Sequence, residues 1–238
     1  MIAKGARDGD RAGGYVPGVL SLARREPSAI LLVAQLSAVL LYPFMEGSDV
    51  GRALFSVFGI AILGLVVLAV RTTPGLTWIS VLLGVPATIL LLIQAVTGDD
   101  GLLPYSSGLE AALYFYAGGA LISYMLADHV ITRDELFAVG ATFTLVAWAF
   151  AYLYTVCQAI EPGSFTAAID PTGERTWMEL LFLSFTTLSS TGLSDVVPVK
   201  PFARGLVMLE QLAGIAYVAM VVTRLIGLLV VHPHDEKT

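Results

Sequence analysis

Charged residues and cysteines are scarce in this sequence. Asp, Glu, Lys and Arg make up 13% of its 238 residues, against about a quarter in an ordinary soluble domain. Apolar residues make up 56%, and the mean hydropathy is +0.80. Because lipid can replace water around most of such a surface, the composition indicates a protein embedded in a membrane.

Several functional classes lack their usual signals. The single cysteine, Cys157, cannot form a disulfide within the chain, and its apolar neighbours predict a packing role. The net charge of −6 leaves no basic surface for nucleic acid. Phosphate-binding glycine loops, nucleophile elbows and helical histidine pairs with an acidic partner are absent from the sequence. We therefore expect neither an enzyme nor a nucleic-acid partner.

Apolar runs of membrane-spanning length recur along the chain, since a helix needs about 20 such residues to cross the hydrocarbon core. A further run, at 176–188, is too short to cross and predicts a re-entrant segment. The sequence thus predicts an all-α membrane protein with six transmembrane helices and one re-entrant helix. The six long runs lie at about 28–45, 52–71, 76–97, 109–130, 136–158 and 202–231.

Charges beside these runs predict the orientation. The basic residues of the N-terminal segment, together with Arg71 and Arg133, flank one side, whereas the opposite side is mainly acidic. By the positive-inside rule, both termini are then cytoplasmic in a multi-pass protein of the cell membrane. The short run and its return segment open outward.

Residues 184–198 read Ser-Phe-Thr-Thr-Leu-Ser-Ser-Thr-Gly-Leu-Ser-Asp-Val-Val-Pro. Non-helical backbone at membrane depth is tolerated only where protein or water satisfies its polar groups. A short helix from Thr176 to Leu188, followed by this hydroxyl-rich segment, fits that exception. The helix would direct its partly negative C-terminal end toward a water-filled cavity and favour a cation there. An ordinary loop over 189–194 is the alternative.

This segment resembles the pore helix and signature filter of potassium channels, usually written T-V-G-Y-G-D. The resemblance extends from about Asp134 to Leu229, as outer helix, pore helix, filter and inner helix. Val197-Pro198-Val199 and Arg204 also match the pattern usual after the filter. In the order of the signature, the matching residues are Ser190, Thr191, Gly192, Leu193, Ser194 and Asp195.

The resemblance implies a homotetramer, because each chain contributes one pore segment to a shared axis. Residues Ser190 to Ser194 would form the ion-conducting filter, with backbone carbonyls lining successive ion sites and the Ser190 hydroxyl completing the innermost one. Thr187 and Asp195 would support the filter, and Gly214 would be a hinge of the inner helix. The permeant ion would be K⁺, with Na⁺ as a further candidate, and no cofactor is implied.

With this resemblance, the sequence divides into four parts. The long helices before the pore form one domain, and the outer helix, pore helix, filter and inner helix form another. The expected bounds are a cytoplasmic N-terminal segment at 1–27, a four-helix domain at 28–131, a pore domain at 132–231 and a cytoplasmic tail at 232–238.

Two filter positions depart from the family pattern. Leu193 replaces an aromatic residue whose hydroxyl braces the filter, and Ser194 replaces the second glycine. A left-handed residue with a Cβ atom costs about 1–2 kcal/mol, so four copies would cost roughly 4–8 kcal/mol, comparable with the net stability of a domain. Either the Ser194 hydroxyl compensates through local hydrogen bonds, or the outer filter abandons the family geometry and loses ion sites. We favour the second outcome, which would weaken potassium-over-sodium discrimination.

The fourth predicted span, 109–130, contains no Arg or Lys, and Glu110, Asp128 and His129 are expected near its ends. Voltage sensing needs charge that moves through the field, so we expect no voltage gating. The four helices before the pore are then a scaffold around it or a site for a lipid or hydrophobic ligand.

Two charged residues fall inside the last span. Glu210 would accept hydrogen bonds from hydroxyls of the pore helix or filter and support the filter, or it is a protonated packing group. Arg224 would reach lipid headgroups or ring the inner mouth. The sequence therefore predicts a passive potassium-conducting channel. A weakly selective monovalent cation channel and a non-conducting membrane interaction protein remain alternatives.

Overall fold

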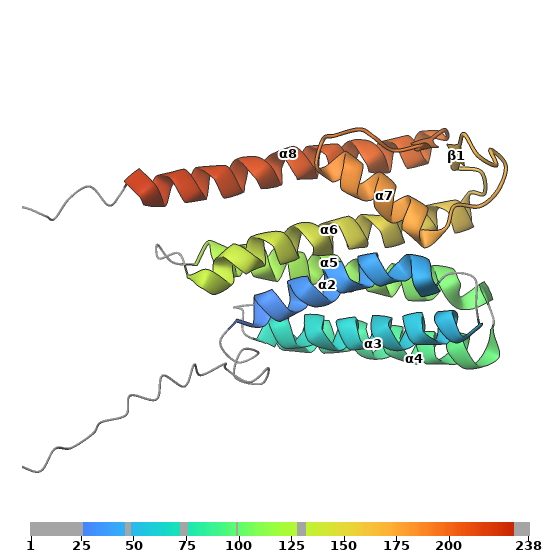
Figure 1. Ribbon diagram of the computed structural model, residues 1–238, viewed down its shortest axis with the longest axis horizontal. Helices are drawn as coiled ribbons and strands as arrows, with labels where there is room; N and C mark the ends of the chain where they lie inside the picture. Colours follow the sequence, from blue (N-terminus) through green and yellow to red (C-terminus); the bar gives the residue numbers. More distant parts are fainter. Residues whose placement is uncertain (1–25, 46–48, 72–75, 99, 128–131, 231–238) are drawn as a thin grey trace, which may run out of the picture.

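The computed structural model describes residues 26–45, 49–71, 76–98, 100–127 and 132–230. Long helices lie side by side along a common axis, and one short helix is tucked between two of them (Figure 1). The elements are α2 (Pro27–Met45), α3 (Asp49–Arg71), α4 (Thr77–Thr97), η1 (Asp100–Leu102), α5 (Leu103–Met125), α6 (Arg133–Ile160), β1 (Phe165–Ala167), α7 (Trp177–Leu188), β2 (Val196–Pro198) and α8 (Pro201–Val230).

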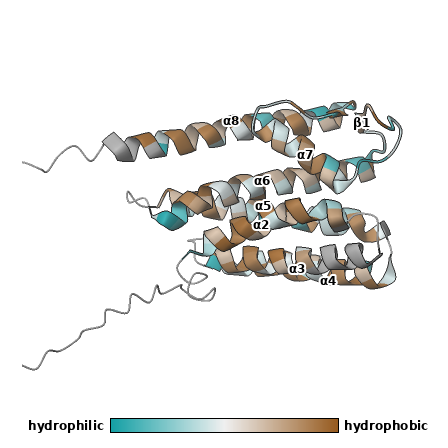
Figure 2. Cartoon of the chain, in the orientation of Figure 1, coloured by the Kyte–Doolittle hydropathy of each residue, from teal (hydrophilic) through white to brown (hydrophobic). Residues whose placement is uncertain are grey.

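Each predicted apolar run corresponds to a helix. By length and composition, four helices of the described residues can cross a membrane, namely α2, α4, α6 and α8. The crossing of α3 and α5 stays a prediction. Hydrophobic residues cover most of the helix lengths, and hydrophilic residues gather at the helix ends and around β1, as expected for a membrane protein (Figure 2).

The expected bounds of the fourth span were wrong. α5 begins at Leu103 with Pro104 in its first turn, a position that proline favours because the first helical N–H groups need no partner within the helix. The polar residues Ser106 and Ser107 kept this turn out of the apolar run. Glu110 consequently lies inside the helix and is buried. Asp128 and His129 lie outside the described residues, as do 1–25 and the predicted tail 232–238.

Helix α6 is the centre of the fold. α2, α3, α4 and α5 pack on one another, and α2 and α5 also contact α6. α7 and α8 pack against the other side of α6 (Figure 1). A large apolar core fills the space between the first four helices and α6, and a second core joins α6, α7, α8 and the two strands.

The starts of α2 and α6 are fastened together. Asp134, in the first turn of α6, accepts hydrogen bonds from the backbone N–H of Ser28 at 3.0 Å and from its hydroxyl at 2.9 Å. Both residues are buried. The contact satisfies a backbone donor that the first turn of a helix otherwise leaves without a partner. α2 therefore begins at the same end of the bundle as α6, and α8 ends there too (Figure 1).

Candidate functional site

The short helix α7 has a well-defined start. Its N-cap, Thr176, accepts a hydrogen bond from the backbone N–H of Glu179 at 3.3 Å, and the Glu179 carboxylate accepts one from the Thr176 N–H at 2.6 Å. This reciprocal capping box fixes where the helix begins. The predicted helix from Thr176 to Leu188 is confirmed, and its 12 residues are too few to cross a membrane.

Arg175 organises the loop before α7. Its side chain is buried and donates to the backbone carbonyls of Asp170 at 2.6 Å and Gly173 at 2.7 Å. It also pairs with Glu179 at 3.2 Å. The backbone of Arg175 exchanges two hydrogen bonds with the Gln158 side chain at the end of α6. The sequence suggested only a loop charge here, because these partners depend on the folded turn.

A small antiparallel sheet holds the segment after the hydroxyl-rich run. β1 pairs with β2, with Thr166 opposite Val197. Val196 is buried in the second core, which anchors the chain two residues after Ser194. Sequence reasoning missed both strands, although the β-branched residues of Val196-Val197 and Thr166 favour strand structure.

The end of α7 sets the backbone of the hydroxyl-rich segment. The N–H of Ser190 donates to the Thr187 carbonyl at 3.0 Å, and the N–H of Thr191 donates to the Thr186 carbonyl at 2.9 Å. Ser190 has a φ of +61°. These are the hydrogen bonds and the left-handed residue of a Schellman motif, in which glycine is the usual left-handed residue. Helix termination thus determines the conformation of Ser190.

Carbonyl groups after this cap remain available. Gly192 is left-handed, with a φ of +66°, and its N–H also donates to the Thr186 carbonyl, at 3.1 Å. Residues 190–193 are all exposed. Within the described residues, no hydrogen bond is donated to the carbonyl oxygens of 190–193. Such oxygens can replace water around a cation.

Ser194 does not adopt the left-handed conformation that its position in the family pattern would require. In the described part of the chain, the left-handed residues other than glycine are Asp170 and Ser190. The Ser194 hydroxyl instead accepts a hydrogen bond from the Val196 N–H at 3.1 Å. The backbone at Ser194 therefore differs from the left-handed one expected of a glycine at this position. Whether ion sites are lost is a separate prediction.

The other expected filter residues lie as follows. Leu193 is 76% exposed. Asp195 is exposed and forms no hydrogen bond or ion pair with the described residues of its own chain. Thr187 is buried and supports the segment through its carbonyl, which accepts from Ser190. Bracing by Asp195 remains a prediction that would need a neighbouring chain.

Glu210 of α8 is fully buried and joins three helices. Its carboxyl group accepts a hydrogen bond from the Tyr154 hydroxyl of α6 and lies within hydrogen-bonding distance of the Ser184 hydroxyl of α7. Ser184 is also 2.7 Å from the carbonyl oxygen of Ala147. A hydroxyl proton serves one acceptor at a time. If the Ser184 hydroxyl donates to the Ala147 carbonyl, it can only accept from Glu210. A protonated Glu210 carboxyl could then donate to Ser184 while it accepts from Tyr154.

Gly214, the expected hinge, is a site of close contact. A Cβ atom there would lie 2.8 Å from the carbonyl carbon and 3.0 Å from the Cα of Leu188, and nearer still to its carbonyl oxygen. Only glycine lets α8 approach the end of α7 this closely. α8 itself is one helix of 30 residues that continues through Gly214. Close packing is thus sufficient reason for this glycine, and a hinge role remains a prediction.

Comparison with known proteins fits this arrangement. Residues 120–231 match the family model described as an ion channel, of the type with two transmembrane helices. This part of the chain is therefore similar to the ion channel domains of the potassium channel superfamily. The match runs from the end of α5 through α6, α7 and α8. Comparisons with curated proteins and with solved structures each gave no match.

Among the described side chains of α8, those that contact the rest of the chain lie along one face. Buried positions recur at three- and four-residue spacing, at Ala203, Leu206, Val207, Glu210 and Tyr217. The other described positions are more exposed and mostly apolar. They include Met208, Leu209, Leu212, Ile215, Val218, Val222 and Ile226.

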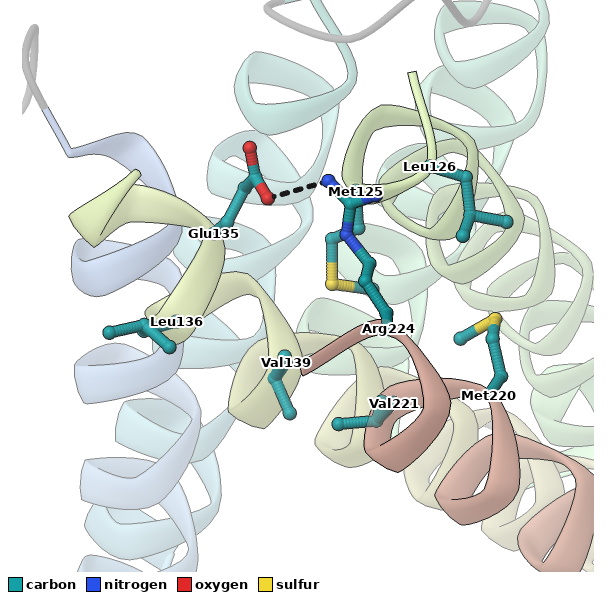
Figure 3. A pocket seen from close by; sticks show the side chains of 8 residues that line it. All are labelled: Met125, Leu126, Glu135, Leu136, Val139, Met220, Val221 and Arg224. Carbon is teal, nitrogen blue, oxygen red and sulfur yellow. Dashed lines mark hydrogen bonds and ion pairs between the residues drawn. The ribbon is translucent and has the colours of Figure 1, made fainter. Parts of the chain in front are cut away.

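Arg224 fits neither expected place. It pairs with Glu135 in the first turn of α6, with 3.0 Å between the guanidinium nitrogen and the carboxylate oxygen. Figure 3 shows this pair beside a cavity bordered by Met125 of α5 and Met220 of α8. The cavity measures about 20 Å³, enough for one water molecule. The pair ties the start of α6 to the last turns of α8.

An aromatic cluster connects the first four helices to the start of α7. Trp177 of α7 packs against Trp148 and Tyr152 of α6, with ring centroids 5.2 and 5.5 Å apart. Tyr114 of α5 contacts the same two α6 rings. Glu110 of α5 is buried. Sequence reasoning missed this cluster because its members are far apart in the chain.

Replacing Gly214 with Ala should destabilise the protein. The added methyl group must push α8 away from Leu188, and overpacking of this kind costs about 1–3 kcal/mol. Gly205→Ala is the matched control, because a Cβ atom at Gly205 has nothing within 4 Å. Thermal unfolding of the detergent-solubilised protein measures both. Equal midpoints for the two variants would contradict the close-contact account.

Substitutions of Glu210 should separate hydrogen bonding from charge. Glu210→Gln can accept from Tyr154 and donate to Ser184, so its stability should stay within about 1 kcal/mol of the wild type. Glu210→Leu leaves both hydroxyls with fewer partners and should cost about 1–3 kcal/mol for each buried group left unsatisfied. Gln211→Leu, at an exposed position of α8, is the control in the same thermal assay. A Gln variant as unstable as the Leu variant would show that the carboxyl is ionised.

Proposed function

We propose that the chain is the subunit of a homotetrameric, passive cation channel that conducts K⁺ and is not voltage-gated. The observation that carries this proposal is that residues 190–193 are exposed and that their carbonyl oxygens have no hydrogen-bond partner within the described residues. They follow the C-terminal end of a helix that is too short to cross the membrane. The ion channel domain also argues against an enzyme.

The electrostatics of α7 support a cation site. The C-terminal end of a helix carries a partial negative charge, equivalent to about half an elementary charge. Carbonyls arranged around the axis would replace the hydration shell of the ion. The Ser189 and Thr191 hydroxyls, 3.1 Å apart, add further oxygen atoms to the same exposed surface.

The exposed face of α8 supports assembly. An exposed apolar stripe along a helix is satisfied either by lipid or by another protein surface. One segment of carbonyls per chain cannot surround an ion, and four copies around one axis can. The exposed Leu193 and Asp195 would then contact neighbouring chains, which is where the expected bracing by Asp195 would occur.

The backbone at Ser194 supports the proposal that the channel discriminates only weakly between K⁺ and Na⁺. Ser194 lacks the left-handed backbone that a second glycine would provide, and its hydroxyl is engaged by the N–H of Val196. We propose that one or more outer ion sites are missing, which leaves fewer sites in line and weakens the preference for K⁺ over Na⁺.

The channel would lack intrinsic voltage sensing. Moving one elementary charge through the membrane field is worth about 2.3 kcal/mol per 100 mV, and α5 contains no Arg or Lys. We propose a multi-pass protein of the cell membrane with cytoplasmic termini, since Arg71 and Arg133 lie at the end of the bundle where α2 begins.

Cation flux from liposomes tests conduction. The reconstituted protein should release K⁺ down its gradient, and Gly192→Ala should reduce this flux at least tenfold, because the left-handed backbone of Gly192 strains any residue with a Cβ atom. The matched control is Gly163→Ala. Gly163 has a φ of +75° in the outer loop, and neither glycine has an atom within 4 Å of an added Cβ.

If conduction is through this segment, Gly163→Ala keeps its flux. No flux from the wild-type protein, in a preparation shown to be tetrameric, would instead support a non-conducting membrane interaction protein. Equal losses in both variants would mean that flux reports general stability rather than the filter.

Reversal potentials measure selectivity. Ser194→Gly should raise the K⁺-to-Na⁺ permeability ratio, because glycine can adopt the left-handed conformation that Ser194 does not. Ser194→Ala removes the hydroxyl but keeps the Cβ atom, so it should leave the ratio low. A ratio that rises equally in both variants would assign the effect to the hydroxyl and refute the backbone explanation.

A further inference from the structure

A groove runs between α3 and α4, away from the channel domain. Its volume is about 450 Å³. Apolar side chains form almost all of its wall, and several of them, including Leu68, Val85 and Ile89, are at least half exposed. The lining residues are Ile60, Leu63, Gly64, Val67, Leu68, Arg71, Val81, Gly84, Val85, Thr88 and Ile89.

Thr88 and Arg71 are the two polar side chains that line the groove, and only Arg71 is available to bind a ligand. The Thr88 hydroxyl donates to the Gly84 carbonyl at 2.8 Å and is therefore satisfied within α4. Arg71, in the last turn of α3, is exposed and forms no ion pair or hydrogen bond with any residue that the structure describes. The groove thus combines an apolar trough with a cation at one end.

The length of the groove matches one leaflet of a membrane. From Ile60 to Arg71, α3 advances about 16 Å, at a rise of about 1.5 Å per residue. Half of a hydrocarbon core of about 30 Å is about 15 Å. An acyl chain lying in this trough would therefore place its headgroup beside Arg71.

The position of the groove favours lipid over a neighbouring chain. α3 and α4 pack against α2 and α5, whereas α8 packs against α6 and α7 on the far side of the chain (Figure 1). A pore axis beside α8 leaves this side facing outward. The groove is open, because a Cβ atom at Gly64 would have nothing within 4 Å.

We propose that an anionic phospholipid binds here, with one acyl chain in the α3–α4 groove and its phosphate paired with Arg71. Apolar burial holds the chain in the groove, and the guanidinium selects a negatively charged headgroup over a zwitterionic one.

Native mass spectrometry of the purified full-length protein tests this site. Phosphatidylglycerol should bind at a saturable site and phosphatidylcholine more weakly. Gly64→Phe fills the trough and should abolish the tight phosphatidylglycerol site. Gly119→Phe is the matched control for bulk, since Gly119 is also exposed with nothing within 4 Å of an added Cβ.

Charge variants test the headgroup contact. Arg71→Ala should weaken phosphatidylglycerol binding about fivefold, the scale of one basic side chain near an anionic headgroup, and Arg71→Lys should restore most of it. Arg133→Ala, an exposed arginine at the same end of the bundle, should change nothing. Thermal midpoints establish that each variant is folded.

Three results would overturn the proposal. Binding that is unchanged in both Gly64→Phe and Arg71→Ala would place the lipid elsewhere. Equal affinity for phosphatidylcholine would remove the role of Arg71. Val85 lies in the groove and is 52% exposed. If the Val85→Cys variant forms a disulfide between two chains, another copy of the chain covers the trough. None of these readouts depends on ion conduction, so the site stands or falls separately from the channel proposal.

Discussion

The contacts of Glu210 hold together the part of the molecule on which the candidate filter depends. Its carboxyl group joins α8 to Tyr154 of α6 and Ser184 of α7 inside a fully buried cluster. A buried polar group that loses its partners costs about 1–3 kcal/mol, so the three helices keep one relative position. Four residues further along α8, Gly214 lets the backbone touch the end of α7. Together these contacts fix where α7 ends.

The fixed end of α7 determines the backbone that follows it. At the end of α7, the N–H groups of Thr191 and Gly192 both donate to the Thr186 carbonyl. Four residues after Gly192, Val196 begins β2 and pairs with β1. At the start of this stretch, the carbonyl oxygens of residues 190–193 accept no hydrogen bond from the described residues. A ring of oxygen atoms for a cation needs such a segment to be rigid, since a mobile loop would adapt to any ion.

The sequence predicted the elements better than their partners. Apolar runs located the long helices and α7, because lipid-facing and buried helix surfaces are both apolar. The sequence indicated a hydroxyl partner for Glu210 in the short helix, and Ser184 of α7 is one. Tyr154, the other partner of Glu210, and Glu135, the partner of Arg224, lie 56 and 89 residues away in the chain, so no local pattern identifies them. The start of α5 was missed because two serines interrupt its apolar pattern.

The backbone strain of the segment falls at Ser190 rather than at Ser194, which changes what limits the filter. At Ser190 a left-handed residue completes a helix cap, and two hydrogen bonds offset a cost of about 1–2 kcal/mol. At Ser194 no such cap exists, the backbone is not left-handed, and the side-chain hydroxyl accepts a hydrogen bond from the Val196 N–H. The inner end of the segment is therefore fixed by helix termination, and the outer end by strand pairing. In the proposed channel, selectivity would therefore come from the few carbonyls between the two.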